Sequence, residues 1–242
     1  MVLAAVFVFL AAIVRGYSGF GFSLLTITSL SLVFSPAEVV PSVFLLEIAA
    51  SAHLLPGIRR EIHWRSLMPL VAGTIVGTPI GVFLLANVPG DPMQVALAAF
   101  VLVATWFLWR GFALKSMPDR ATAVGVGAAA GLANGAFGIG GPPVILFYFA
   151  SPAGHLAGRA SLIAYFFITD IIGLVFLSHQ DLVTGAALFR AAIFLPALLA
   201  GVWLGARSFK SADPAVFRKW VLAILAGLAL LSAAKGIYAL AH

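Results

Sequence analysis

The stretch NGAFGIGGPP, at residues 134–143, interrupts a long apolar segment of the chain with four glycines and two prolines. A second stretch, RGYSGFGF at residues 15–22, interrupts the apolar sequence near the start of the chain. Irregular backbone at membrane depth persists only inside protein or beside a water-filled cavity, because lipid cannot satisfy freed backbone groups. Paired breaks in two halves of a membrane protein therefore predict the substrate site of a transporter.

The glycines of the two breaks match in position. A shift of 119 residues aligns the pairs Gly16 and Gly135, Gly19 and Gly138, and Gly21 and Gly140. The segments SPA (35–37), AGTIVG (72–77) and DP (91–92) also recur in the same order, as SPA (151–153), AGVWLG (200–205) and DP (213–214). These matches predict a duplication, with a first transmembrane repeat at 1–116 and a second at 117–242.

Composition places the chain in a membrane. Hydrophobic residues make up 62% of it and charged residues 9%, with a mean hydropathy of +1.12, whereas soluble domains hold about a quarter charged residues. The net charge of +6 does not indicate a nucleic-acid partner, because the basic residues lie between apolar stretches as loop charges do. We interpret the apolar N-terminus as the first membrane element rather than a cleaved signal peptide.

Eight membrane elements are predicted, since about 20 apolar residues span a bilayer. They cover residues 2–34, 37–57, 66–87, 93–113, 120–150, 156–178, 182–206 and 215–240. If all eight cross, the basic joints fall on both sides of the membrane, against the excess of Lys and Arg expected in cytoplasmic loops. If the first and fifth elements are re-entrant hairpins, eleven of the fourteen Lys and Arg residues, Arg159 among them, share one side.

The charge pattern thus favours an all-α polytopic fold of two inverted repeats. Each repeat would hold one re-entrant or broken helical element plus three transmembrane helices, with both termini outside. Eight plain spans are the alternative. Glycines spaced four apart, as at Gly73, Gly77 and Gly81, are expected to let helices pack closely in lipid.

The breaks predict an anion site. A helix N-terminus presents unpaired N–H groups and a partial positive charge, and Pro142 and Pro143 suit the first turn of a new half-helix. The alternative is a purely structural kink. The candidate substrate-binding residues are Arg15, Gly16, Ser18, Gly19, Gly21, Asn134, Gly135, Gly138, Gly140 and Gly141.

Arg15 is the cation beside the first break. An unpaired Arg at bilayer depth costs at least about 2.5–3.5 kcal/mol, so we expect it to contact an anionic ligand, to pair with Glu47 or to reach an interface. Ser18 and Asn134 offer neutral hydrogen bonds to a ligand, or they cap a half-helix. Glu47 and Asp170 lie well inside predicted spans and are candidates for proton coupling; a structural pairing is the alternative.

The chain resembles the sulfite exporter TauE/SafE family of membrane permeases, also called DUF81. The resemblance rests on RGYSGFGFSLL and ANGAFGIGGPPVILFY near the start of each half, on the chain length and on about eight apolar elements. The second break is close to the family pattern G-x-x-G-x-G-G-[GP]. The first departs from it, with Phe22 and Ser23 where Gly141 and Pro142 stand in the second. The resemblance implies export of sulfur oxyanions or organosulfonates across the inner membrane.

We therefore expect an inner-membrane, multi-pass secondary transporter whose partners are a small anion and the lipid bilayer. It would use no cofactor and no metal, and proton coupling would run through Glu47 or Asp170. An anion channel and a permease for a neutral or cationic solute are the alternatives. A membrane enzyme is disfavoured, because no cluster of metal ligands or nucleophiles stands out. The pattern predicts neither the oligomeric state nor the exact substrate.

Overall fold

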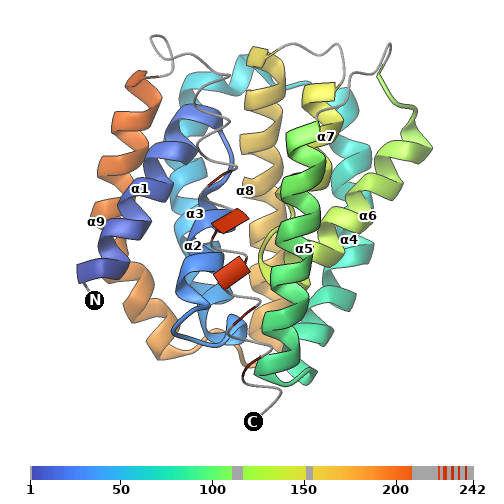
Figure 1. The fold of residues 1–242 in the computed structure, drawn as a ribbon. Coiled ribbons are helices and arrows are strands. Elements are labelled where there is room, and N and C mark those ends of the chain that lie inside the picture. The colour runs from blue at the N-terminus through green and yellow to red at the C-terminus, as the bar shows by residue number, and fades with distance from the viewer. Residues whose placement is uncertain are drawn as a thin grey trace.

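The computed structural model describes residues 2–110, 117–150 and 155–208, together with isolated positions between 223 and 238. Within these residues the secondary structure is entirely helical (Figure 1). The helices are α1 (Val2–Ser18), α2 (Phe22–Leu30), α3 (Pro36–Ile58), η1 (Arg59–Glu61), α4 (Trp64–Asn87), α5 (Gly90–Arg110), α6 (Arg120–Phe137), α7 (Gly141–Ala150), α8 (His155–His179) and α9 (Gly185–Ser208). The predicted element at 215–240 lies outside the described residues, apart from the isolated positions.

Five of the described helices are long and apolar enough to cross a membrane. They cover Pro36–Glu61, Trp64–Asn87, Gly90–Arg110, Leu156–His179 and Gly185–Arg207. These segments correspond to five of the six full spans that the charge pattern predicts. Large apolar side chains such as Ile80, Phe83 and Phe189 stand exposed on the outside, where lipid is the favourable solvent. The predicted all-α polytopic fold is confirmed.

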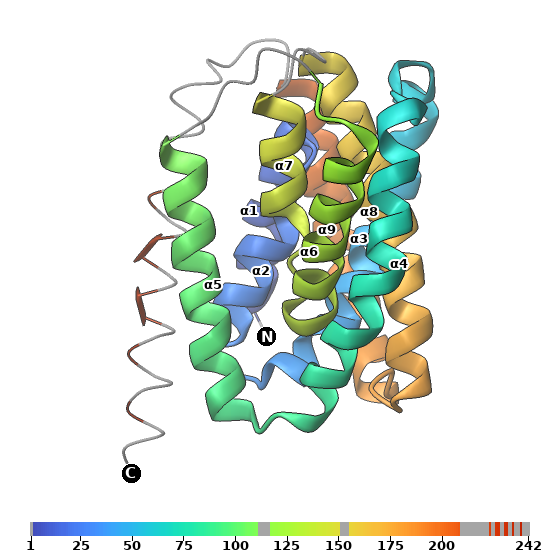
Figure 2. The same ribbon diagram turned by 90° about the vertical axis from the view of Figure 1, so that its right-hand side faces the viewer.

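The first and fifth elements are broken, as predicted, and the chain turns back at each break (Figures 1 and 2). Helix α6 begins where α4 begins, because Gly73 of α4 packs against the Val124 backbone. Helix α7 returns to that end, since the Tyr148 hydroxyl lies 3.2 Å from Ser66 Oγ in the first turn of α4. Helices α1 and α2 form a similar hairpin that opens toward the other end of the bundle (Figure 1).

Positive backbone φ angles explain why the helices stop at these positions. Gly19, Gly21 and Gly138 have φ of 81°, 91° and 67°, which side chains with a Cβ rarely adopt. Gly138 closes α6 in a left-handed cap, donating its N–H to the Asn134 carbonyl at 2.7 Å. Helix α7 then begins at Gly141, with two prolines in its first turn.

Glycines hold the hairpins against the spans. Helix α6 packs along α4, and α1 packs along α9. A Cβ added at Gly127 would overlap the Leu70 carbonyl oxygen, and one at Gly205 would overlap that of Ile13. The prediction that regularly spaced glycines serve close helix packing is confirmed.

The same contacts recur in the two halves. Gly81 packs against the Leu132 carbonyl, and Gly205 packs against the Ile13 carbonyl. Leu132 and Ile13 are separated by 119 positions, which is also the shift between the two breaks. The helices α4 and α9, however, match at a shift of 124, which pairs Gly81 with Gly205 and Gly77 with Gly201. The sequence alignment of AGTIVG with AGVWLG is therefore wrong by one helical turn, because small residues every four positions fit equally well in either register.

Hydrogen bonds repeat with the same two shifts. Ser42 on α3 donates to the Ala187 carbonyl at 3.1 Å, while Ser161 on α8 accepts from the His63 N–H at 2.9 Å. These bonds place the start of α9 beside the start of α3, and the start of α4 beside the start of α8. Helices α4 and α9 therefore run in opposite directions through the bundle, as Figure 1 also shows.

Six of the nine described arginines lie at one end of the bundle. They are Arg59, Arg60, Arg65, Arg110, Arg120 and Arg207, at the ends of helices that meet there (Figure 1). Arg190 lies at the other end and pairs with Glu38 at 2.9 Å. Arg159, expected to share one side with these charges, lies in the second turn of α8, whose start is beside the start of α4. Its side chain is buried, because it packs against the end of α1.

Candidate functional site

Four side chains that carry a formal charge are buried in the described part of the chain, and they come from both halves: Arg15, Glu47, Arg159 and Asp170. Two are basic and two are acidic, so their formal charges balance. Arg15 and Glu47 form an ion pair, and Asp170 lies within electrostatic range of both. Because a lone charge at this depth is costly, the grouping explains how the bundle tolerates them.

Arg15 ends α1 at the first break and has no solvent exposure. Its Nη1 donates to the Gly19 carbonyl at 2.8 Å, and its Nη2 donates to Ser51 Oγ at 2.7 Å. The Phe166 ring of α8 lies against the guanidinium, with 4.8 Å from Cζ to the ring centroid. Burial rules out the interpretation that Arg15 reaches the membrane interface.

Glu47 of α3 is the ionic partner of Arg15. Its Oε2 lies 2.8 Å from Arg15 Nη2, and its Oε1 accepts hydrogen bonds from the backbone N–H of Ser23, at 3.2 Å, and from the Ser23 hydroxyl. Ser23 is in the first turn of α2, so a carboxylate of the protein occupies the helix N-terminus that was predicted to attract an anion. The alternative in which Arg15 pairs with Glu47 is the one that the structure adopts.

The second break is organised around Asn134. Its Oδ1 accepts a hydrogen bond from the Gly140 N–H at 3.1 Å, just before α7 begins, and its Nδ2 donates to Asp170 Oδ1 at 3.2 Å. The other oxygen, Asp170 Oδ2, is buried and accepts no hydrogen bond in the described structure. Asn134 therefore caps the break and also holds one oxygen of Asp170.

The two breaks use corresponding positions with different chemistry. Arg15 bonds to Ser51 and Asn134 bonds to Asp170, each across 36 positions of sequence and with the same shift of 119 between the pairs. In the first half the hairpin is charged and the span supplies a hydroxyl. In the second half the hairpin is neutral and the span supplies the charge. The centre is thus electrostatically asymmetric although its framework repeats.

The other predicted site residues divide into two groups. Gly19, Gly21, Gly138, Gly140 and Gly141 lie at the breaks, whereas Gly16 and Gly135 lie within α1 and α6, against the backbones of α9 and α4. Ser18 bonds to the Val14 carbonyl in α1 at 2.7 Å and to the Phe20 carbonyl within the first break at 2.8 Å. Its hydroxyl therefore stabilises the break itself.

Arg159 is the central residue that sequence reasoning missed. Its Nε donates to the Tyr17 carbonyl at 3.1 Å and its Nη2 to the Gly16 carbonyl at 2.7 Å. A cation at the C-terminal end of α1 satisfies carbonyls that the helix leaves unpaired and complements its dipole. A signal was available, because Arg159 falls inside the predicted span 156–178.

Arg159→Ala is expected to destabilise the protein, because two carbonyls at the tip of the first hairpin lose charged donors. Such a loss is about 1.5–3 kcal/mol, or roughly 3–12 °C in the melting temperature. Thermal unfolding of the detergent-purified protein measures the effect. Arg65→Ala is the control, since Arg65 is exposed in the first turn of α4 and a surface charge contributes little. Equal melting temperatures for the two variants would contradict this role of Arg159.

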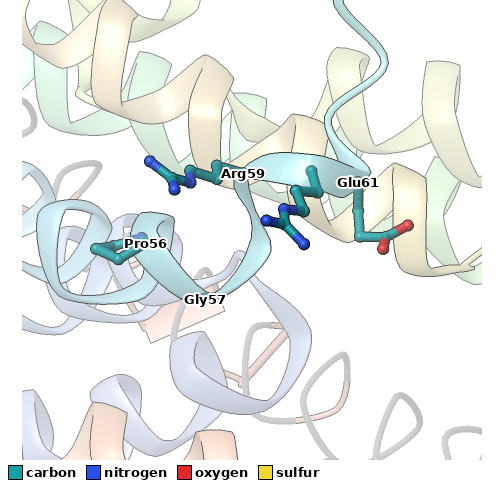
Figure 3. Close-up of a pocket in the computed structure, with 5 residues that line it drawn as sticks. Pro56, Gly57, Arg59 and Glu61 are labelled. Atoms are coloured by element: carbon teal, nitrogen blue, oxygen red, sulfur yellow. The ribbon is translucent and has the colours of Figure 1, made fainter.

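The centre is closed to solvent. Arg15, Glu47, Asn134 and Asp170 are each at most 2% exposed. One open pocket is at the surface joint between α3 and α4, lined by Pro56, Gly57, Arg59, Arg60 and Glu61 (Figure 3). Its charged side chains extend outward from the short η1 turn (Figure 3). None of these lining residues belongs to the buried centre.

Comparison with known proteins gives a family match over most of the chain. The model of a family described as Sulfite exporter TauE/SafE matches residues 4–232. The chain is 28% identical over 219 residues to the "Probable sulfite/organosulfonate exporter TauE" of Cupriavidus necator, which covers 87% of this chain and 84% of that protein. No solved structure matches the chain. The matched residues include both breaks and the four buried charged side chains.

Proposed function

The chain belongs to the sulfite exporter TauE/SafE family, and we propose that it exports sulfite or a small organosulfonate across the inner membrane. As a family member with five described helices of membrane-spanning length, it is a multi-pass membrane transporter and not an enzyme. The observation that carries the substrate proposal is Arg15, a fully buried cation in the last turn of α1, beside the first break. A cation held in that place favours an anionic ligand.

The anion would bind between the two hairpin tips. Arg15 would supply the charge, the N–H groups of α2 and α7 would supply further donors, and Ser18 and Asn134 would border the site. The glycines at the breaks let an anion approach the backbone closely. We assign Gly16 and Gly135 a supporting part in this site, because their lack of a side chain lets the hairpins lie against α9 and α4.

Transport would alternate access by moving the two halves, 1–116 and 117–242, as inverted repeats. Three observations support this proposal: the hydrogen bonds that recur with fixed shifts, the opposite directions of α4 and α9, and hairpins that open toward opposite ends. The arginine-rich end would face the cytoplasm. The closed centre favours such a carrier over an open anion channel.

Protons would supply the energy for transport through Asp170. Glu47 is held by Arg15 and Ser23, whereas Asp170 has one oxygen without a donor and forms no ion pair within the described residues. A proton taken up there removes a buried charge that no cation pairs. Of the two candidate carboxylates, Asp170 is therefore the better proton carrier.

Arg15→Ala tests the binding site. Losing a charge-assisted hydrogen bond to the ligand should weaken sulfite binding by about ten- to a hundredfold. Titration calorimetry of the purified protein with sulfite, methanesulfonate, sulfate and acetate measures this and ranks the anions. Because the variant also leaves Glu47 without its partner, Arg15→Ala/Glu47→Gln is measured beside it. Unchanged affinity in both variants, with normal folding, would make Arg15 structural.

A further inference from the structure

The N-terminus of α2 lacks a cap from its own sequence. Gly21 stands at the N-cap position with φ of 91° and offers no side chain. The backbone N–H and hydroxyl of Ser23, in the first helical turn, instead donate to Glu47, which comes from a different helix. A carboxylate from α3 thus takes the place that a bound anion takes at a helix N-terminus.

The ion pair between Glu47 and Arg15 leaves hydrogen-bonding capacity unused. Arg15 Nη2 is 2.8 Å from Glu47 Oε2, yet this oxygen accepts no aligned hydrogen bond and Arg15 Nε has no acceptor, although both atoms are buried. Guanidinium binds oxyanions best through two parallel N–H bonds. The Glu47 carboxylate does not provide this arrangement, so a better-fitting oxyanion would improve on it.

We propose that Glu47 is a tethered competitor of the transported anion. In this conformation its carboxylate fills the subsite formed by Arg15 and the first turn of α2, and substrate binds by displacing it. The inference deepens the proposed function and rests on it. It assigns Glu47 a part in specificity that neither a structural ion pair nor a proton carrier would have.

The competitor acts on one half only. The position that corresponds to Glu47 in the second half, after the shift of 119, is Phe166. Its ring lies against Arg15 and also beside Gly141 at the start of α7, but it offers no charge to the N–H groups there. Asn134, a neutral side chain, caps that second break through Gly140. The second half therefore has no carboxylate at its helix N-terminus, and displacement concerns the Arg15 subsite alone.

Competition of this kind selects the substrate class. An anion gains affinity only where it binds Arg15 and Ser23 better than a carboxylate does. Sulfite and sulfonates carry three oxygens on one sulfur, so two can accept from Arg15 Nε and Nη2 while the third accepts from Ser23. A small monocarboxylate has two oxygens and merely replaces Glu47. The protein should therefore prefer sulfite and methanesulfonate over acetate.

Glu47→Gln tests the proposal by the sign of its effect. The amide removes the competing charge, so sulfite should bind about ten- to a hundredfold more tightly, whereas Arg15→Ala weakens binding. Sulfite counterflow in proteoliposomes should slow, because the bound anion is no longer displaced. Glu38→Gln is the matched control and should leave both quantities unchanged, since Glu38 is exposed and far along α3. Weaker or unchanged sulfite affinity in Glu47→Gln would overturn the proposal.

Glu47→Asp covers the case in which the amide variant does not fold. It keeps the charge, but a side chain shorter by one methylene cannot reach both Arg15 and Ser23, so sulfite affinity should rise severalfold; a fall or no change counts against the competitor. The proposed function fails separately if neither sulfite nor methanesulfonate binds while another anion does. Tighter binding of that anion to Glu47→Gln would still support the competitor. Binding of none of the four anions to any variant would overturn both.

Discussion

Gly138→Val is expected to abolish sulfite transport while the protein still inserts into the membrane. Gly138 has φ of 67° at the tip of the second hairpin, where a β-branched residue is strained by about 1–3 kcal/mol. A Cβ there would also lie 2.5 Å from Ile27 Cδ1 of α2 and 3.1 Å from Val40 Cγ2 of α3, so these side chains, which pack against the second break, would have to move. Both effects act on the unit that is proposed to bind the anion.

Efflux of sulfite from proteoliposomes measures this loss, with Gly125→Val as the control. Gly125 lies on α6 of the same hairpin, and a Cβ added there would meet nothing within 4 Å. Transport should therefore stay near the wild-type rate in the control. Equal loss in Gly125→Val and Gly138→Val, at equal protein levels, would show that the hairpin tip has no special part.

Gly140→Val should cause a similar loss for a different reason. Its φ is not positive, but a Cβ would lie 2.9 Å from both the Ala130 carbonyl oxygen and Asn134 Cβ. The side chain would push Asn134 away from the Gly140 N–H and so release Asp170. Gly127, on the regular part of α6, is not a suitable comparison site, because a Cβ there would overlap the Leu70 carbonyl oxygen.

Local sequence signals predicted the framework well. Hydropathy located the five spans that the structure describes, and clustered glycines located both breaks, because helix termination depends on residues adjacent in sequence. The contacts between distant segments were less accessible. Arg15 had three candidate environments, and only the packing of α3 against the hairpin decides for Glu47. Arg159 was counted with the charges of one side, but its burial against α1 depends on a helix contact that the sequence does not show.

Register was the other limit of sequence reasoning. Glycines at intervals of four residues align equally well one turn apart. The residue types of AGTIVG and AGVWLG therefore match, although the two segments do not make corresponding packing contacts. Charge asymmetry between the breaks depends on pairs separated by 36 positions, Arg15 with Ser51 and Asn134 with Asp170. Each member has several plausible partners in sequence. Three-dimensional packing therefore had to select among them.

Asp170→Asn is expected to abolish accumulation of sulfite driven by an imposed pH gradient. Asp170 is fully buried, Asn134 holds its Oδ1 at 3.2 Å, and its Oδ2 accepts no hydrogen bond from the described residues. A carboxylate that gains and loses a proton at Oδ2 would tie proton movement to movement of the second hairpin. Asparagine keeps the size and the bond to Asn134 but carries no exchangeable charge.

Two measurements on reconstituted protein separate coupling from binding. Sulfite binding and counterflow exchange need no net proton movement, so Asp170→Asn should retain both while gradient-driven accumulation falls to background. Glu38→Gln, which neutralises an exposed carboxylate, should keep full accumulation. Glu47→Gln separates the roles of the two central acids. If Glu47 only competes with the anion, this variant should still accumulate sulfite under a pH gradient, although its transport rate is low. Full accumulation in Asp170→Asn and in Glu47→Gln would leave neither acid as the proton carrier, and a proton-independent uniporter would then be the better description.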